Sequence, residues 1–385
     1  MDVDRVRDAL AVPGAAPIHA RLRQAIHAQI TDGTIKPGMC LPSERLLQEE
    51  LSLSRSTVRQ AIGALIQSGL LQSVAGTGTF VMERPGTPPS LGLIGLIVSG
   101  PNFHFFYPQL AASLNHGLRQ SGYGLAMMLH NDRAEDLEEL VDEILAQGIV
   151  ALALTPPRFG DVDPVVDQLR RKKIPFIFIG RRGTNSRVDW VATDNEKVGY
   201  DATRHLVDLG HRRIVHAGLL DYSTGKDRAA GYERAMSEAG LESRVVELRE
   251  QRAPESSADG VPQEHLATPA YEEALHLWGE GASEPPTAAF CFNDVTAMGV
   301  YKACRDLSLR IPEQVSLIAV DNLPTIRHFE VPITTMALPG EEIGRLGADL
   351  LLRRLAGDEM PPQHHLLPAR LIKRLSTAAP RSGQG

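Results

Sequence analysis

The stretch from Leu41 to Val81 constrains the fold more than any other part of this 385-residue chain. Ser43 stands immediately before a run in which apolar residues recur with helical spacing, which is the position of a helix N-cap. Ser54 repeats the arrangement before a second such run. The pattern therefore predicts two short helices, near 43–50 and 54–68, that are joined by a tight turn as in a helix-turn-helix.

A hairpin, or wing, is predicted directly after the second helix. Leu70–Val74 and Thr79–Met82 have the composition of short strands, and the turn-forming residues Gly76, Thr77 and Gly78 lie between them. In the second helix, the first turns carry side chains that can reach base edges and phosphates. These are Arg55, Ser56, Thr57 and Arg59.

Acidic residues are absent from Leu51 to Met82, although the whole chain has a formal charge of −7. Residues 1–85 hold nine basic and eight acidic residues, whereas the remainder holds 31 and 39. Because carboxylates repel phosphates, an acidic body cannot bind nucleic acid by itself. We therefore expect any contact with DNA to be confined to the first domain.

Length and composition exclude several classes of protein. The length favours two or three domains, and the 43% hydrophobic fraction suits a globular chain. The charged start predicts no export signal, and no apolar run is long enough for a membrane helix. Cys40, Cys291 and Cys304 show no metal-binding spacing. We expect a cytoplasmic protein without a metal site, a cofactor or a membrane partner.

The rest of the first domain is predicted from helix signals. Residues 1–16 are expected to be a lightly packed lead-in, and apolar residues every fourth position predict a helix over Ile18–Thr31. Three prolines follow the wing, so residues 86–90 are predicted to be a short, semi-rigid linker between a domain at 1–85 and one at 91–380.

The first domain resembles the winged-helix DNA-binding domain of the GntR family. The resemblance is carried by PIHARLRQAI (17–26), GTIKPGMCLPSERLL (33–47), LSRSTVRQAIGALIQSGLL (53–71) and GTGTFV (76–81). It implies DNA contacts by Arg45 at the start of the second helix and by Arg55, Ser56, Thr57 and Arg59 in the recognition helix. It also implies that the wing tip, Gly76, Thr77 and Gly78, enters the minor groove.

From Leu91 onward, strand and helix patterns alternate. Strands are predicted at 91–98, 125–130, 149–155, 175–179, 213–218, 245–250, 288–293 and 315–320. This alternation predicts an α/β fold with doubly wound parallel sheets, and its two runs suggest two lobes with a cleft between them. Residues 251–266 are predicted to be a surface loop.

The second domain resembles the ligand-binding domain of LacI-family regulators and periplasmic sugar-binding proteins. The resemblance spans about residues 91–376 and is carried by segments such as VATDNEKVGYDATRHLVDLGHRRI (191–214), FNDVTAMGV (292–300), RIPEQVSLIAVDN (310–322) and ITTMALPGEEIGRLGADLLL (333–352). A GntR-type domain followed by a LacI-type domain is similar to the arabinose-repressor type of architecture.

Ligands of open α/β sheets bind beyond the carboxyl ends of the strands. The predicted strand ends carry Arg, Asp and Asn with aromatic residues nearby, and such groups suit a sugar. Among the residues that lie in the loops after these strands, the resemblance favours Phe106, Tyr107, Arg181, Arg228, Asn293 and Asp321 as ligand-binding residues.

Other interpretations of single residues remain open. Arg181 or Arg228 could form an intramolecular ion pair, and Phe105 could face the ligand in place of Phe106 or Tyr107. Asp194-Asn195 is interpreted as a helix cap and is therefore left out of the site.

The function predicted is that of a ligand-controlled transcription regulator, expected to be a repressor. Its expected partners are near-palindromic double-stranded operator DNA, a small effector that is most simply a sugar, and a second copy of the chain. Two alternatives are a pyridoxal-phosphate aminotransferase-like regulator and a sugar-binding transport component. No catalytic signature is present, so we expect no enzyme activity.

Overall fold

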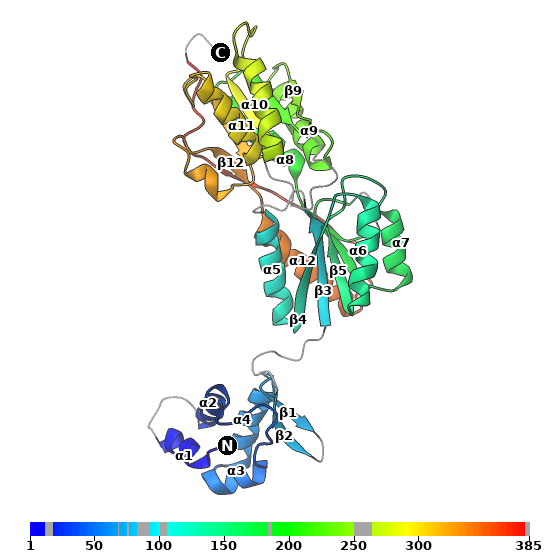
Figure 1. Ribbon diagram of the computed structural model, residues 1–385, viewed down its shortest axis with the longest axis vertical. Helices are drawn as coiled ribbons and strands as arrows, with labels where there is room; N and C mark the ends of the chain where they lie inside the picture. Colours follow the sequence, from blue (N-terminus) through cyan, green and yellow to red (C-terminus); the bar gives the residue numbers. More distant parts are fainter. Residues whose placement is uncertain are drawn as a thin grey trace. The chain divides into compact units, whose positions relative to one another are not determined.

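The computed structural model describes residues 1–11, 18–67, 69–74, 77–82, 92–100, 106–183, 187–249 and 264–381. It divides into two compact units, Met1–Leu91 and Gly92–Gly385, which we call the head and the body (Figure 1). The predicted linker, the wing residue Gly76, Phe105 and most of the predicted loop 251–266 lie outside the described residues. No helix in the described ranges combines the length and apolarity needed to cross a bilayer.

The described residues of the head form four helices and a two-stranded antiparallel sheet. Its elements are α1 (Val3–Ala11), α2 (Ile18–Thr31), α3 (Glu44–Leu51), α4 (Arg55–Gln67), β1 (Leu71–Val74) and β2 (Gly78–Val81). The predicted helix-turn-helix and wing are therefore present. The expectation of a lightly packed lead-in is wrong, because residues 3–11 form a helix whose Val6 is buried in the head core.

Lobe 1 of the body is a six-stranded sheet with helices on both faces. Its strands, in spatial order, are β13 (His364–Leu367), β7 (Trp190–Thr193), β6 (Phe176–Gly180), β5 (Ile149–Leu154), β3 (Gly92–Ser99) and β4 (Tyr123–His130), and all pairings are parallel. One face is covered by α5 (Phe106–Gln120) and α12 (Gly340–Leu355). The other is covered by α6 (Ala134–Ala146) and α7 (Asp163–Arg171) (Figure 1).

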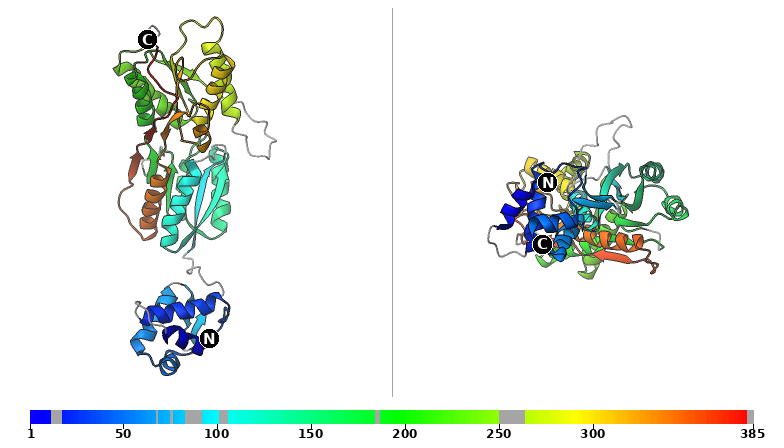
Figure 2. Two further views of the ribbon diagram at one scale, coloured as in Figure 1. Left: turned by 90° about the vertical axis from the view of Figure 1, so that its left-hand side faces the viewer. Right: turned by 90° about the horizontal axis from the view of Figure 1, so that it is seen from below.

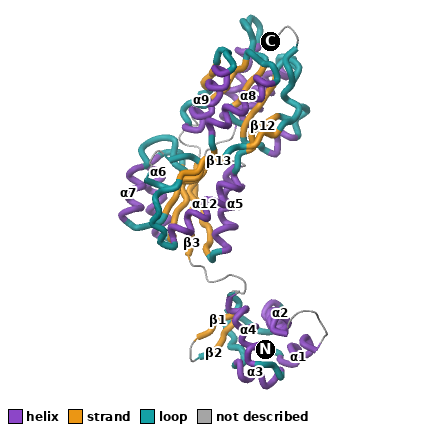
Figure 3. Tube along the Cα trace, turned by 180° about the vertical axis from the view of Figure 1, so that it is seen from behind, coloured by secondary structure: helices purple, strands orange, loops and turns teal. Residues whose placement is uncertain are grey.

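Lobe 2 repeats this design. Its sheet order is β14 (Arg370–Ile372), β12 (Thr334–Ala337), β11 (Ser316–Val320), β10 (Ala288–Cys291), β8 (Ile214–Gly218) and β9 (Arg244–Glu247). Only the β12–β14 pairing is antiparallel. The pair α8 (Asn195–Asp208) and α9 (Ser223–Glu238) packs on one face, and α10 (Glu264–Trp278) and α11 (Asp294–Asp306) pack on the other. Figure 3 shows strands between layers of helices in both lobes.

The chain passes between the two lobes three times. It crosses between β7 and α8, between β12 and α12, and between β13 and β14. The two ends of the described body therefore lie in different lobes, Gly92 in lobe 1 and the segment after β14 in lobe 2. Helix α12 returns from lobe 2 to lie beside α5, as the left view in Figure 2 shows.

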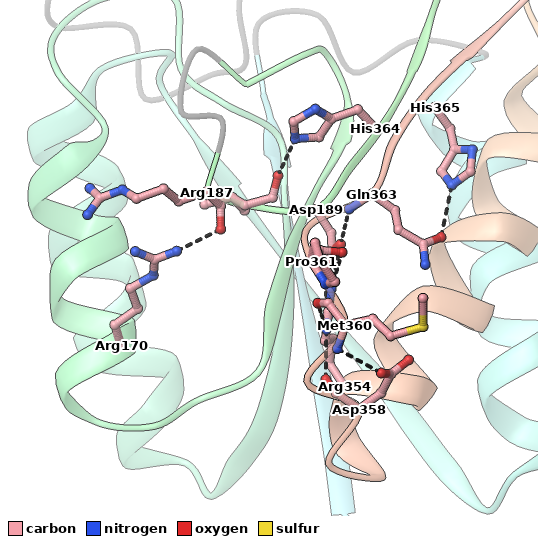
Figure 4. Close-up of polar contacts among 11 residues, drawn as sticks. Arg170, Arg187, Asp189, Arg354, Asp358, Met360, Pro361, Gln363, His364 and His365 are labelled. Atoms are coloured by element: carbon pink, nitrogen blue, oxygen red, sulfur yellow. Dashed lines mark hydrogen bonds and ion pairs between the residues drawn. The ribbon is translucent and has the colours of Figure 1, made fainter.

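The edge of lobe 1 that contains β7 and β13 was not predicted, and an ion pair between a half-buried arginine and a buried aspartate organises it (Figure 4). Arg354, at the end of α12, donates from Nε and Nη2 to the carboxylate of Asp189, at 2.6 and 2.9 Å. Its Nη1 donates to the carbonyls of Asp358 and Met360, both at 2.7 Å. The guanidinium therefore fixes the conformation of the segment between α12 and β13, and this segment places β13 beside β7.

Candidate functional site: a DNA-binding surface and an inter-lobe cleft

The recognition helix α4 begins at a serine cap. The Ser54 hydroxyl accepts a hydrogen bond from the backbone N–H of Thr57 at 3.2 Å. It also contacts the hydroxyls of Ser56 at 2.9 Å and Thr57 at 2.8 Å. Two of the predicted DNA-binding residues are therefore held at the N-terminus of α4, where exposed N–H groups favour a phosphate.

The predicted DNA-binding arginines are exposed on α3 and α4. Arg55 occupies the first position of α4 and is solvent-accessible. Arg59 lies 3.6 Å from Glu44 at the start of α3, and Arg45 lies 3.6 Å from Glu49 with 86% of its side chain exposed. These loose surface pairs cost little to exchange for phosphate contacts.

The wing requires glycine at position 78. Gly78 has φ +136°, and a Cβ there would lie 2.7 Å from the sulfur of Cys40. Thr77 is exposed at the tip beside it. The head thus presents a helix N-terminus, arginines and a wing, and the stretch from Leu51 to Met82 that supplies them contains no carboxylate.

A cavity between the lobes contains all six residues predicted to bind a ligand. The empty space between its lining atoms is about 500 Å³, and this figure includes space that opens to solvent. The lining residues from the prediction are Phe106, Tyr107, Arg181, Arg228, Asn293 and Asp321. Gly180, Thr193, Asn195, Tyr222, Thr224, Phe292 and Leu338 complete it.

Arg181 enters the cavity from lobe 1 as one half of a buried ion pair. Its Nη1 lies 2.6 Å from Oδ1 of Asp132 and donates to the Pro156 carbonyl at 3.1 Å. Ser99 donates its hydroxyl to the other oxygen of Asp132 at 2.6 Å. Burial alone would raise the pKa of Asp132, but Arg181 and Ser99 hold it below its ordinary value. The intramolecular pair considered for Arg181 is present, and it fixes the guanidinium at the cavity wall.

Arg228 enters from lobe 2, on α9. It donates from Nε to Oδ1 of Asn195 at 3.0 Å and from Nη1 to the carbonyl of Phe292 at 2.6 Å. Its guanidinium carbon lies 4.6 Å from the centre of the Phe292 ring. Burial lowers the pKa of Arg228, and the negative charge of Asp321 opposes that effect. Asn195 and Phe292 therefore hold the guanidinium at the cavity wall.

Asn293 and Asp321 follow neighbouring strands of lobe 2. Asn293 caps α11 by accepting the Thr296 N–H at 2.9 Å, so its Nδ2 amide is the group that can donate to a ligand. Asp321 has φ +112°, an unfavourable conformation for a residue with a side chain, of the kind that clusters at functional sites. The next residue, Asn322, instead accepts a hydrogen bond from Arg374 at 2.5 Å.

Aromatic rings form the apolar part of the cavity. Phe106 and Tyr107 stand edge to face, with ring centres 5.2 Å apart, on the lobe 1 side. Tyr222 and Phe292 stack with centres 6.1 Å apart on the lobe 2 side. Burial raises the pKa of the Tyr107 phenol, so this residue is an uncharged hydroxyl.

Asn195 lines the cavity, although the sequence interpretation assigned Asp194-Asn195 to a helix cap and left both residues out of the site. Its neighbour Asp194 does cap α8, by accepting the Lys197 N–H at 2.9 Å. Asn195 itself lines the cavity and orients Arg228. Thr193 was missed because strand β7 was not predicted. The principle that ligands bind beyond the carboxyl ends of strands could therefore not be applied to this residue.

Comparisons with known proteins match both parts of the chain. Residues 18–81 match the family described as bacterial regulatory proteins, gntR family. Residues 203–377 match a periplasmic binding protein-like domain.

Relatives and solved structures agree with this division. The arabinose metabolism transcriptional repressor of Geobacillus stearothermophilus is 28% identical over 343 residues, which cover 88% of this chain and 91% of that protein. The arabinose metabolism transcriptional repressor of Halalkalibacterium halodurans is 26% identical. The similarity covers 94% of this chain and 97% of that protein. The structure of a LacI family transcriptional regulator from Enterococcus faecium with bound ribose is similar in fold, with a TM-score of 0.61 at 24% identity. That similarity covers 74% of this chain and 99% of the other.

The winged head, the two-lobed body and these comparisons lead to one architecture. The chain joins a GntR-type winged-helix DNA-binding domain to a LacI-type, periplasmic-binding-protein-like domain, in the arrangement of the arabinose-repressor type.

Proposed function

We propose that this chain is a cytoplasmic transcriptional repressor whose operator binding is controlled by a neutral sugar bound between the lobes. The domain boundaries we propose are 1–85, 86–90 and 91–380. The observation that carries the proposal is the cavity into which both lobes place rigid polar groups and aromatic rings. The relatives along almost the whole chain are named repressors, which favours this function over an aminotransferase-like regulator or a transport component.

The charge balance of the cavity supports a neutral ligand. Arg181 is paired with Asp132, and Arg228 is accompanied by Asp321. Each lobe thus offers one cation together with one carboxylate. Such a surface offers donors and acceptors to hydroxyl groups, while aromatic faces cover C–H groups. The positive charges of the cavity are thus balanced by carboxylates, and no surplus of positive charge is offered to the phosphate group of a phosphorylated ligand.

A thermal-shift panel tests the proposed ligand class. The panel contains neutral sugars, with arabinose and ribose among them, sugar phosphates and nucleobases, each added to the full-length protein. A ligand that binds only the folded state raises the melting temperature by mass action. We expect a neutral sugar to do so, and the same sugar to change operator affinity. Stabilisation by sugar phosphates or nucleobases alone would contradict the proposed class.

Operator binding is expected to depend on the exposed arginines of α4. Arg55→Ala and Arg59→Ala should each weaken binding by roughly 1–3 kcal/mol if they contact bases. Fluorescence anisotropy with duplexes selected from a random pool measures the effect. Arg23→Ala on α2, an exposed arginine outside the proposed surface, is the control. Unchanged affinity in both α4 variants would show that the recognition helix is assigned wrongly.

We further propose that the body forms a homodimer through strand β4. This strand is an edge of the lobe 1 sheet, and Met127 and Leu129 on it are 45% and 46% exposed. Exposed apolar edges favour pairing with another chain, and a second copy would match the two-fold symmetry of a palindromic operator.

Charge placed on this edge should separate the dimer. Leu129→Glu is expected to shift sedimentation from dimer to monomer, because a carboxylate would be buried in the interface. Leu366→Glu is the matched control, since Leu366 is 46% exposed on β13 at the opposite edge of the same sheet. An unaltered dimer in Leu129→Glu would place the interface elsewhere.

A further inference from the structure

An arginine at the rim of the cavity joins the two lobes. Arg158 follows β5 in lobe 1, and Asp221 follows β8 in lobe 2. Nη2 of Arg158 lies 2.7 Å from Oδ2 of Asp221. The Arg158 side chain is only 7% exposed, whereas that of Asp221 is 63% exposed. Because the guanidinium is largely removed from water, this contact is stronger than an ordinary surface ion pair.

The same guanidinium lies against aromatic rings from both lobes. Its central carbon is 3.9 Å from the centre of the Tyr222 ring in lobe 2 and 4.5 Å from that of Phe159 in lobe 1. Cations bind ring faces at these distances, and the attraction grows when the cation is desolvated. Tyr222 also lines the cavity, so Arg158 holds one of the cavity's aromatic walls in position.

Asp132 connects this contact to the interior of the cavity. Its carbonyl accepts the backbone N–H groups of Arg158 at 3.1 Å and Phe159 at 2.9 Å. Its carboxylate pairs with Arg181, which lines the cavity. One buried residue with φ +61° therefore orients both the cavity arginine and the rim arginine.

We propose that Arg158, Phe159, Asp221 and Tyr222 form an inter-lobe clamp that sets how often the cleft is closed before an effector binds. The clamp makes Arg158 a positioning residue for the proposed effector site, and this role rests on the proposed function. A second bridge, between Arg182 of lobe 1 and Asp227 of α9 at 2.6 Å, supports the same closure. The Arg182 side chain is 54% exposed and that of Asp227 is 17% exposed, so this pair, like the first, has one partner that is largely removed from water.

Distances between the lobes test the clamp without any effector. Spin labels are attached to cysteines that replace the exposed residues Glu139 on α6 and Glu233 on α9, in a full-length Cys40→Ser background. Pulsed electron–electron double resonance then measures the distribution of distances between the two spin labels, one of which is in each lobe. Arg158→Gln is expected to increase the ratio of open to closed lobes by about tenfold, as loss of a desolvated cation–ring contact implies.

Two further variants keep the outcome decisive. Asp221→Asn changes an exposed side chain, so it preserves folding and should broaden the distances in the same direction. Arg133→Gln is the matched control, because Arg133 lies in lobe 1 and pairs with Glu135 of the same lobe. Distances that stay as narrow in Arg158→Gln and Asp221→Asn as in Arg133→Gln would overturn the clamp. Since no sugar is added, that result would leave the proposed effector untouched, and failure of the sugar panel would leave the clamp untouched.

Discussion

Replacing Arg228 by alanine should lower the affinity for the effector by at least about 100-fold, because a buried, charge-assisted donor is lost and its partners remain desolvated. Arg228 is held by Asn195 and by the Phe292 carbonyl, and it lies in the field of Asp321. An effector that bridges the lobes would lose its main anchor in lobe 2. Operator affinity should stay within about twofold, since the head is a separate compact unit.

The measurement is calorimetric titration with the sugar that emerges from the thermal-shift panel, alongside operator anisotropy. Arg234→Ala is the matched control, because Arg234 lies on the same helix but pairs at the surface with Glu196 and Glu238. Retention of full effector affinity in Arg228→Ala would remove Arg228 from the proposed site. Loss of effector and operator binding together would instead indicate misfolding.

The second large effect is expected where α8 and α9 touch. A Cβ at Gly231 would lie 1.9 Å from the backbone oxygen of Glu196, and one at Gly199 would lie 2.0 Å from that of Arg228. Neither backbone can move without separating the helices. Gly231→Ala should therefore destabilise the body by about 3 kcal/mol or more. Because Asn195 and Arg228 stand on these two helices, effector affinity should fall as well.

A glycine with free space around it provides the opposite result. Gly63 lies within α4, and a Cβ there would meet no atom within 4 Å. Gly63→Ala should stabilise the head by about 0.5–1 kcal/mol, through helix propensity and a less flexible unfolded chain. Differential scanning calorimetry distinguishes the two cases by the transition that moves. A body transition that is unchanged in Gly231→Ala would contradict the close helix contact.

The cleft was largely predictable because parallel sheets gather their carboxyl ends at one edge. Arg181, Asn293 and Asp321 each follow a buried apolar strand that was visible in the sequence, and all three line one cavity. The head was predictable for a local reason, since Ser43 and Ser54 mark helix starts by a chemistry that acts over three residues.

Other features depend on contacts that are distant in sequence. Strands β13 and β14 are only four and three residues long, and they become strands because β7 and β12 offer edges with which they pair. Arg181 pairs with Asp132, which is 49 residues away in the sequence. An intramolecular ion pair for Arg181 could therefore be considered from the sequence, but the residue that pairs with it could not be identified. The sequence of helix α1 did contain a helical pattern, because Val3, Val6 and Leu10 share one helical face. The pattern was overlooked because the helix is only nine residues long.

The three crossings between lobes have a consequence for synthesis of the chain on the ribosome. The head is complete once residue 82 has emerged, because its strands and helices are contiguous in sequence. Lobe 1 begins at Gly92 but needs β13, which ends at Leu367, before its sheet is whole. Domains generally fold as units while the N-terminal part is made first. A nascent chain therefore carries a finished DNA-binding domain long before the body that regulates it can respond.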